Sequence, residues 1–591
     1  MFRPRLLFSA IRSFRIRLNH IRVMGFVVRA PAVVRTKKNR EKLMKLKRRF
    51  LLFAIAMVAP LLFAGAHRAQ RVSLADDDDL PKREKLTGDF INALRIAEDN
   101  YAGRADYDRL AKGAILGMLH TLDPHSSYLD RKEYEKFLND QHSRYSGIGS
   151  TIAQRNGQVF IMSPFDGTPA YKAGLRYGDQ IVEINGESAN GWSSLQVSNK
   201  LIGPEGTPVT VKVTRLGESK PLEYRLVRGT VPLLSIVNYF MLNRNVGYIN
   251  LQRGFNTTTP EEMRDAIRDL KGQGMNSLLL DLRGNPGGLV DAAVKVSNNF
   301  LYRGQKIVSM RGRPTSFPSR EISATNTQPE DFPIIVLVNR GTASAAEIVA
   351  ASLQDHDRAR IVGENSFGKG LVQSVWQLSD GSGLTLTTGK YYTPSGRLIQ
   401  RDYSGRSFYD YYLQRGDKEA VQQTEEKHTD SGRTVYGGGG INPDVLVKVP
   451  AHDIELQRVW IESVFDFSRQ LAAGAIPGFP DLKVTRPIER GHRLQPNDYV
   501  VGDKVIAAYK TFLHDKKDAK ESRVDKDVEF LKRQIRYEVV TAAYGQEIAY
   551  QVLLDGDAQM QKGLTELPKA RTMAEDVRRQ WTARSGGLKR D

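Results

Sequence analysis

The sequence predicts a mixed α/β protein built from several domains. Its 591 residues are enough for more than one hydrophobic core. Between residues 246 and 377, short apolar runs typical of buried strands alternate with segments of helical periodicity, which is the pattern of an α/β sheet domain. Segments of helical periodicity also precede and follow residues 246–377. We therefore predict a helical N-terminal region, a small β-rich domain, an α/β core and a helical C-terminal extension.

The positive charge is concentrated at the front of the chain. Residues 1–50 contain sixteen Lys and Arg against one Glu, a net +15, so the remaining residues hold only +5 of the total of +20. No basic patch elsewhere interleaves with aromatic side chains, as a nucleic-acid surface would. We therefore predict no nucleic-acid partner.

The basic segment leads into an uncharged apolar run, residues 50–66, which ends in Ala64-Gly65-Ala66. A basic stretch, a short apolar run and an Ala-x-Ala site together describe a signal peptide. The run also lies at the lower limit for a membrane span, so an uncleaved anchor in the inner membrane is the alternative. Either interpretation of residues 1–66 predicts an exported protein of the periplasm or cell envelope. The chain has no Cys, which excludes disulfides, thiol catalysis and thiolate metal sites.

Residues 67–145 are predicted to form the helical N-terminal region. Two apolar stripes at helical spacing support this prediction: Phe90, Leu94 and Ala97, then Leu110, Ile115 and Leu119. His120 and His125 flank a Leu-Asp-Pro sequence, but no third ligand accompanies them. We therefore predict that these histidines cap or pack rather than bind a metal.

Residues 146–228 are predicted to form the small β-rich domain. Short alternating strands are predicted at residues 159–162, 180–184 and 209–213, with glycine-containing turns between them and a short helix over residues 170–175. This arrangement resembles a PDZ domain.

The loop of Gly147, Ile148 and Gly149 matches the PDZ loop whose backbone N–H groups bind the C-terminal carboxylate of a peptide, while the peptide backbone adds to a sheet edge. This match predicts capture of free C-terminal tails. The alternative is that these glycines only turn the chain.

Residues 229–450 are predicted to form the α/β core. Residues 246–251, 277–282 and 332–338 have the composition of strands, and a helix opens at Thr259-Pro260 with a cap followed by Pro. Another helix is predicted over residues 343–353. In such a domain the functional site lies where loops meet at the strand ends.

Two residues of this core suggest nucleophilic catalysis. Ser344 lies between a predicted strand and a predicted helix. Its hydroxyl is therefore expected to face free backbone N–H groups at the helix N-terminus. Lys369 stands between Gly368 and Gly370 directly before an extended segment, in which Gln373 falls on the same face as Lys369 and is placed to orient the amine. A Lys accepts a proton from Ser only when desolvation lowers its pKa from about 10.4. A Ser with a Lys base is a recognised variant of the nucleophile–base pair.

Five motifs in the expected order resemble those of the carboxyl-terminal processing peptidases, the tail-specific serine proteases of family S41. They lie at residues 281–288, 339–348, 367–373, 391–397 and 440–444, within a resemblance that spans about residues 113 to 445.

The resemblance implies a role for each matching residue. It makes Ser344 the nucleophile, Lys369 the general base and Gln373 the residue that positions the Lys. It also implies an oxyanion hole built from the N–H of Gly287 or Gly288 and the N–H of Ala345. It implies no metal and no cofactor, and its substrates are proteins or peptides with free C-terminal tails.

Two regions depart from the family pattern. Residues 402–435, rich in Tyr and charge, are predicted to be a surface insertion. Residues 451–591 lie beyond the resemblance, and five apolar residues at steps of 4, 3, 4 and 4 predict one long amphipathic helix over residues 521–554: Val524, Val528, Leu531, Ile535 and Val539. Such helices pack on the protease or, alternatively, bind an adaptor or a second copy of the chain.

Two other functions compete with the Ser/Lys endopeptidase. A Ser/His/Asp hydrolase would use His356 with Asp355 or Asp357, but Ser344 lacks the flanking glycines of a nucleophile elbow. A proteolytically inactive PDZ scaffold would bind tails without cutting them, and it would need neither Ser344 nor Lys369. We therefore predict an exported serine endopeptidase.

Overall fold

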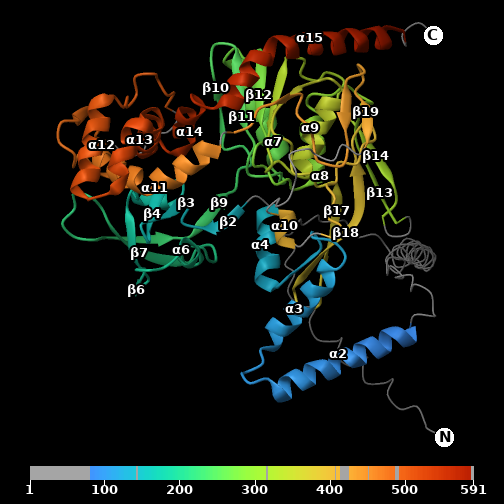
Figure 1. Ribbon diagram of the computed structural model, residues 1–591, viewed down its shortest axis with the longest axis horizontal. Helices are drawn as coiled ribbons and strands as arrows, with labels where there is room; N and C mark the ends of the chain where they lie inside the picture. The colour runs from blue at the N-terminus through green and yellow to red at the C-terminus, as the bar shows by residue number, and fades with distance from the viewer. Residues whose placement is uncertain are drawn as a thin grey trace, which may run out of the picture. The chain divides into compact units, whose positions relative to one another are not determined.

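The computed structural model describes residues 80–141, 144–313, 317–405, 408–412, 425–449, 451–485 and 492–587 (Figure 1). The chain divides into two compact units, residues 1–105 and 106–591. In the first unit the described residues form helix α2 (Leu80–Asn100), none of which is buried. The leader predicted over residues 1–66 lies outside the described residues. None of the helices in the described ranges combines the length and the apolar character needed to cross a membrane.

The second unit begins with two helices on either side of a short strand. Helix α3 (Tyr107–His120) starts at Asp106, whose side chain accepts a hydrogen bond from the Arg109 amide. Strand β1 (Ser127–Leu129) and helix α4 (Arg131–Gln141) follow. The ring of Tyr134 on α4 lies so close to Gly383 that a Cβ there would come within 2.2 Å of it. These helices are therefore packed onto a sheet of the core.

A small antiparallel sheet forms the β-rich domain. Its strand order is β3-β4-β5-β7-β8, with β6 paired to β5, so β3 lies at an edge. The strands are β3 (Ser150–Arg155), β4 (Gln158–Pro164), β5 (Gln180–Ile184), β6 (Glu187–Ser188), β7 (Pro208–Thr214) and β8 (Leu222–Val227). Helices α5 (Pro169–Ala173) and α6 (Ser194–Leu201) complete it, and strands β2 (Arg144–Gly147) and β9 (Gly229–Pro232) pair at its entrance and exit.

The core domain is built on a sheet of six described strands in the order β10-β11-β12-β15-β16-β21. They are β10 (Asn238–Met241), β11 (Val246–Asn250), β12 (Ser277–Asp281), β15 (Ile334–Val338), β16 (Arg360–Gly363) and β21 (Val445–Leu446). All neighbours pair in parallel except β10 with β11. The carboxyl ends of the parallel strands therefore meet at one edge, where sites of such sheets lie.

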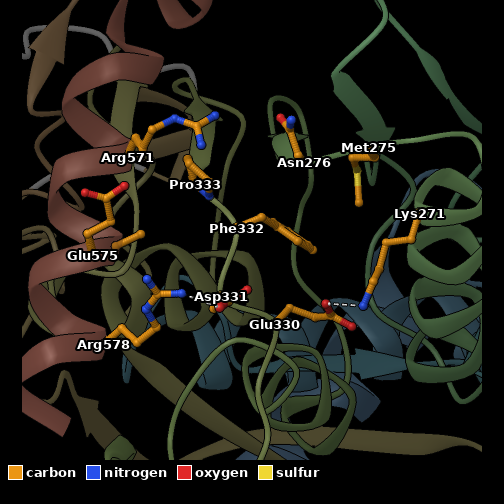
Figure 2. Close-up of a pocket in the computed structure, with 11 residues that line it drawn as sticks. Lys271, Met275, Asn276, Glu330, Asp331, Phe332, Pro333, Arg571, Glu575 and Arg578 are labelled. Carbon is orange, nitrogen blue, oxygen red and sulfur yellow. Dashed lines mark hydrogen bonds and ion pairs between the residues drawn. The ribbon is translucent and has the colours of Figure 1, made fainter. Parts of the chain in front are cut away.

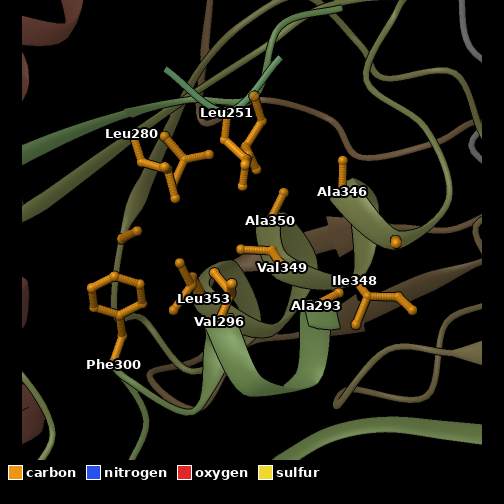
Figure 3. Packing of buried hydrophobic residues seen from close by; sticks show 14 of the residues in the cluster. Leu251, Leu280, Ala293, Val296, Phe300, Ala346, Ile348, Val349, Ala350 and Leu353 are labelled. Atoms are coloured by element: carbon orange, nitrogen blue, oxygen red, sulfur yellow. The ribbon is translucent and has the colours of Figure 1, made fainter. Parts of the chain in front are cut away.

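Helices cover both faces of this sheet. Helices α7 (Thr259–Gly272), α8 (Val290–Ser297) and α9 (Ala345–Asp355) pack on the face of Leu280, and Figure 3 shows Val349 and Leu353 of α9 among these buried side chains. Helices α14 (Gln546–Leu554) and α15 (Ala558–Gly587) pack on the opposite face, where Leu279 points. The alternation of side chains along one strand thus provides two apolar surfaces.

A second sheet, antiparallel, stands beside the first. Its order is β1-β18-β13-β14, with β17 paired to β18. The strands are β13 (Lys306–Gly312), β14 (Arg320–Ser323), β17 (Leu371–Gln377) and β18 (Gly383–Tyr392).

The insertion between these strands and β21 contains helix α10 (Phe408–Tyr412) and the hairpin of β19 (Glu426–His428) and β20 (Thr434–Tyr436). Tyr411 and Val435 are buried. The prediction of a surface insertion is therefore wrong for these residues, because their side chains fill space against the core domain.

The helical extension has a core of its own. Helices α11 (Ala451–Ala473), α12 (Asp503–Asp515) and α13 (Val528–Tyr544) bury Trp460, Tyr509 and Ile535 against each other, with short 3-10 turns at Pro480–Leu482 and Ala519–Lys526.

The single helix predicted over residues 521–554 is wrong. The chain instead runs through a 3-10 turn, α13 and α14, and Gly545, with φ 90°, breaks the path between the two helices. Most of the predicted apolar stripe is buried inside the extension itself. The stripe is therefore occupied by the chain's own packing and does not support an adaptor or oligomer interface.

The extension also contacts the β-rich domain (Figure 1). Phe465 of α11 packs with Phe160 and Met162 of β4. The hydroxyl of Tyr177 donates a hydrogen bond to Glu538 of α13 at 2.6 Å. The extension therefore joins the β-rich domain and the core domain, since α14 and α15 cover the central sheet.

A cavity of about 300 Å³ lies at the amino-terminal edge of the central strands (Figure 2). It is formed by residues just before β12 and β15 and by α15. Four of its charged residues form ion pairs, Lys271 with Glu330 at 2.8 Å and Arg578 with Asp331 at 3.3 Å. This cavity is at the opposite end of the strands from the loops that carry the predicted site.

Candidate active site

Two loops at the carboxyl ends of β12 and β15 are tied together by hydrogen bonds. The Asn339 side-chain oxygen accepts from the Gly284 amide at 2.9 Å. The Ala343 amide donates to the Asn285 carbonyl at 2.9 Å, and the Thr342 hydroxyl donates to the carbonyl of Leu282. The glycine loop after β12 and the turn that leads to Ser344 therefore form one rigid unit.

Ser344 lies at the sharp turn between β15 and α9. Its backbone has φ 56° and ψ −118°, in a region that non-glycine residues rarely adopt. The turn thus has the strained geometry of a nucleophile elbow although it lacks the flanking glycines. Gly287 packs directly on it, since a Cβ at Gly287 would lie 2.7 Å from Ser344 Cβ and 2.9 Å from the amide nitrogen of Ala345. Only glycine permits this approach.

The predicted oxyanion donors differ in what their amides contact. The Gly287 amide donates to the Asn285 side-chain oxygen at 2.8 Å, so it is already engaged. None of the hydrogen bonds among the described residues uses the amides of Gly288 or Ala345. The geometry therefore leaves Gly288 and Ala345 as the two donors to test.

Glu347 links the predicted nucleophile to the predicted base. Its carboxylate is completely buried and accepts from the amides of Ser344 at 2.7 Å, Gly368 at 2.7 Å and Lys369 at 2.9 Å, and from the hydroxyl of Ser366. Burial raises the pKa of Glu347, and the four donors oppose that rise. Glu347 was not predicted from the sequence. The signal that would have indicated it is the Ser-x-x-Glu spacing of a capping box at a helix N-terminus.

Lys369 and Gln373 are in contact, as their spacing on one strand face predicts. Lys369 Nζ donates to Gln373 Oε1 at 2.9 Å, and Gln373 Nε2 donates to the His125 carbonyl at 2.8 Å. Burial lowers the pKa of Lys369 below its ordinary 10.5, although the charges of Glu347 and Asp123 partly offset this. The environment therefore favours the neutral amine that a base needs. In this structure Gln373, and not Ser344, holds the amine.

Tyr391 of β18 joins the same two segments from the other side. Its buried hydroxyl lies 3.0 Å from the Ser344 carbonyl oxygen and 2.5 Å from the Lys369 carbonyl oxygen. Because one hydroxyl faces both carbonyls, it fixes the separation of the two backbones. Its position in the motif at residues 391–397 was visible in the sequence, but this contact was not.

His356, the base of the rival Ser/His/Asp hydrolase, is engaged elsewhere. It follows the last residue of α9 whereas Ser344 precedes the first, so the rise along the helix separates them by about 18 Å. Its ring nitrogens lie 2.7 Å from Asp430 Oδ2 and 2.7 Å from the Lys306 carbonyl oxygen. Both partners accept hydrogen bonds, so this His acts as a donor to them and is not a base for Ser344.

The predicted carboxylate loop lies in the β-rich domain, away from the loops that carry Ser344 and Lys369. Gly149 has φ 74°, and a Cβ there would lie 2.4 Å from Thr168, so the loop requires glycine. The amides of Ile148 and Gly149 donate none of the hydrogen bonds found among the described residues. Gly147 pairs with Gly229 between β2 and β9. The loop directly precedes edge strand β3, against which α6 packs.

A short series of contacts links this loop to the glycine loop after β12. The Phe165 amide donates to the Gly149 carbonyl at 2.9 Å, and the Arg253 guanidinium lies over the Phe165 ring at 6.0 Å from its centre. Arg253 is followed by Gly254, where a Cβ would lie 2.7 Å from the Gly287 carbonyl oxygen. The two predicted binding regions are therefore connected through a short series of neighbours.

Comparisons with known proteins agree with this architecture. A family model described as peptidase family S41 matches residues 245–405, and a PDZ domain model matches residues 160–215. The chain is 37% identical to a carboxy-terminal-processing protease of Bartonella bacilliformis over 336 residues, which are 56% of this chain and 76% of that protein. It is 33% identical to the carboxy-terminal processing protease CtpA of Bacillus subtilis over 362 residues, 60% of this chain and 76% of that protein.

Among solved structures, the photosystem II D1 C-terminal processing protease is 29% identical, with 60% of this chain and 86% of that chain covered and a TM-score of 0.32. The sequence relatives carry the assignment, because the chain covers about three quarters of their length. The predicted resemblance and mixed α/β fold class are confirmed. The chain belongs to peptidase family S41 and is a serine-type peptidase of the carboxy-terminal processing group that carries a PDZ domain.

Proposed function

We propose that Ser344 and Lys369 form the catalytic dyad of an endopeptidase that cleaves proteins bearing free C-terminal tails. The observation that carries this proposal is the Glu347 carboxylate, which accepts from the backbone amides of both residues at 2.7 Å and 2.9 Å. A single buried group thereby fixes the nucleophile and the base relative to each other. Such preorganisation is what proton transfer between two side chains requires.

In the proposed mechanism, neutral Lys369 takes the proton of the Ser344 hydroxyl as Oγ attacks the scissile carbonyl, and later gives that proton to the leaving amine. Gln373 accepts from Lys369 Nζ and keeps the amine in place. The hydrogen bond between Lys369 Nζ and Ser344 Oγ forms in the substrate complex, since catalytic hydrogen bonds often tighten only there. The amides of Gly288 and Ala345 stabilise the oxyanion at the positive end of α9. Water then hydrolyses the acyl-enzyme.

Tail recognition is proposed for the PDZ domain. A substrate tail would add as a strand to the free edge of β3, with its carboxylate on the amides of Ile148 and Gly149. The edge position of β3 and the unused amides support this proposal. The contacts from Phe165 through Arg253 to the glycine loop support a coupling between tail capture and cleavage.

The test compares cleavage of an unfolded protein with an apolar C-terminal tail by the wild type, Ser344→Ala and Lys369→Ala. Lys390→Ala, an exposed Lys on the neighbouring strand β18, is the matched control. We expect both dyad variants to lose cleavage by at least about a thousandfold while the control retains it. Amidation of the tail should reduce cleavage by the wild type. If folded Lys369→Ala still cleaved the substrate, the assignment of the base would be wrong.

We also propose that the protein is exported through residues 50–66. The basic segment before this apolar run and its Ala-x-Ala end support the proposal. The test is fractionation of cells expressing the chain, with N-terminal sequencing of the recovered protein. A mature N-terminus at His67 would indicate cleavage, and an intact chain in the membrane fraction would indicate an anchor. An intact chain in the cytosolic fraction would refute export.

A further inference from the structure

Helix α10 brings two tyrosine hydroxyls to one buried histidine ring. His125 Nε2 lies 3.0 Å from the Tyr411 hydroxyl, and His125 Nδ1 lies 2.9 Å from the Tyr412 hydroxyl. The two aromatic rings stand edge-on to the imidazole, with ring centres 5.3 Å and 5.7 Å away. The proposed mechanism uses neither tyrosine, and both lie in the insertion that departs from the family pattern.

The hydrogen bonds around His125 define where each proton sits. The Tyr412 hydroxyl donates to the Pro124 carbonyl at 2.9 Å, so its oxygen accepts from Nδ1–H of the imidazole. The Tyr411 hydroxyl accepts from the Gln400 amide at 3.1 Å, so it donates to Nε2. This arrangement satisfies every group only when His125 is neutral with its proton on Nδ1. The ring is therefore held in one tautomer and one orientation.

The same histidine supports the predicted base through its backbone. Its carbonyl oxygen accepts from Gln373 Nε2 at 2.8 Å, and Gln373 Oε1 accepts from Lys369 Nζ at 2.9 Å. Its amide is fixed at 2.8 Å by Asp123 Oδ1. Any rotation of the His125 peptide would therefore move the amide that holds the lysine.

Aromatic side chains pack around the segment that precedes Lys369. The Phe367 ring, two residues before Lys369, packs edge-on against Tyr411 at 5.6 Å between centres. The Arg401 guanidinium lies 4.5 Å from the centre of each of these two rings. Tyr411 itself is 1% exposed. The insertion therefore covers the segment that leads into Lys369.

We propose that Tyr411 and Tyr412 are positioning residues for Lys369, acting through His125 and Gln373. The inference rests on the proposed Ser344–Lys369 dyad and adds to it a part contributed by the insertion. The effect of the two tyrosines is to keep the Gln373 amide, and with it the amine of Lys369, in one orientation.

The experiment measures kcat and KM for Tyr411→Phe, Tyr412→Phe and the pair, in the full chain and with the tailed substrate. Each change removes one hydroxyl and keeps the ring. Tyr509→Phe is the matched control, because that tyrosine is also buried and bonds Ser463 at 2.8 Å, but in the helical extension. We expect kcat to fall about tenfold in each single variant and about a hundredfold in the pair, with KM close to wild type and, in each single variant, a Tm no lower than that of the Tyr509→Phe control.

A double-mutant cycle distinguishes positioning from a general loss of structure. If the tyrosines act through Gln373, adding the pair to Gln373→Ala lowers kcat by less than about twofold further. Fully additive losses, or an unchanged kcat in the pair, would overturn the inference while leaving the dyad intact. Retention of cleavage by Lys369→Ala would instead remove the dyad, and the inference with it.

Discussion

Replacement of Glu347 by Gln tests whether one buried carboxylate holds the site together. The substitution keeps the size and shape of the side chain and removes one acceptor oxygen together with the charge. Wild-type Glu347 accepts four hydrogen bonds, two on each oxygen. An amide group matches only part of this arrangement, because its nitrogen is a donor facing donors.

The cost follows from the contacts. In the better orientation the amide nitrogen replaces Oε1, and the Ser366 hydroxyl turns to accept from it, but the Gly368 amide loses its acceptor. A buried donor without a partner costs about 1–3 kcal/mol. The bonds from Ser344 and Lys369 remain but lose the contribution of an ionised acceptor, about 1 kcal/mol each. The total is therefore about 3–5 kcal/mol.

Two assays measure this loss. Thermal unfolding should show a Tm at least about 6 °C lower, since each kcal/mol shifts a domain of this size by about 2–4 °C. Steady-state cleavage below that temperature should show kcat reduced by about a hundredfold, because the serine and lysine loops lose their common anchor. Glu538→Gln is the matched control: Glu538 is also buried, but its side chain accepts one hydrogen bond among the described residues, from Tyr177, which a glutamine oxygen can still accept.

A Glu347→Gln variant that keeps both the wild-type Tm and the wild-type kcat would show that Glu347 does not hold the site together. A loss of the same size in Glu538→Gln would show the same. In that case burial of any carboxylate, rather than the four bonds at Glu347, would determine the effect.

Three further results are expected. Burial lowers the pKa of Lys369 in the folded protein below 10.5, so at a pH between the folded pKa and 10.5 the unfolded chain binds more protons than the folded one. The free energy of unfolding therefore rises with pH in that range, and Lys369→Met should remove this rise in urea titrations. Burial opposes the charged form of His356, but the hydrogen bond and charge of Asp430 outweigh burial and raise the pKa of His356. The stabilisation that the charged His356 contributes is complete below pH 6.5 and is lost as pH rises through the folded pKa. Asp430→Asn should therefore lower Tm more at about pH 5 than at about pH 9. Gly149→Ala should weaken tail-peptide binding, measured by fluorescence anisotropy, at least about tenfold, whereas Gly157→Ala, with the same φ of 74° but open space, should not.

Local patterns predicted the parts of the site that depend on local spacing. Lys369 and Gln373 are four residues apart on one extended segment, and their side chains meet. Ser344 was placed at the strand-to-helix turn by the apolar run before it and the helical pattern after it. The glycine loop was expected directly after the buried strand at residues 277–282. In each case the residues that interact are close in the sequence or lie at the ends of recognisable elements.

Contacts between distant segments could not be predicted in this way. Glu347 meets the amide of Lys369 across 22 residues, and Tyr411 meets His125 across 286. Nothing in the local pattern of residues 402–435 distinguishes a tyrosine that is buried against the core domain from an exposed one. The apolar stripe of the extension, from Val524 to Val539, likewise concealed the boundary at Asp527 between the 3-10 turn and α13, because the helical spacing of apolar residues continues across it.

The arrangement around Glu347 resolves a conflict in the chemistry of the base. A buried carboxylate near Lys369 favours the charged amine and so raises its pKa, which opposes the neutral form that takes a proton. Glu347, however, contacts the main-chain amide of Lys369 and not its Nζ, and its four acceptor positions are already filled by other donors. The amine instead meets the uncharged oxygen of Gln373. The carboxylate can therefore fix the lysine backbone while desolvation, the larger effect, favours the neutral amine that the proposed base requires.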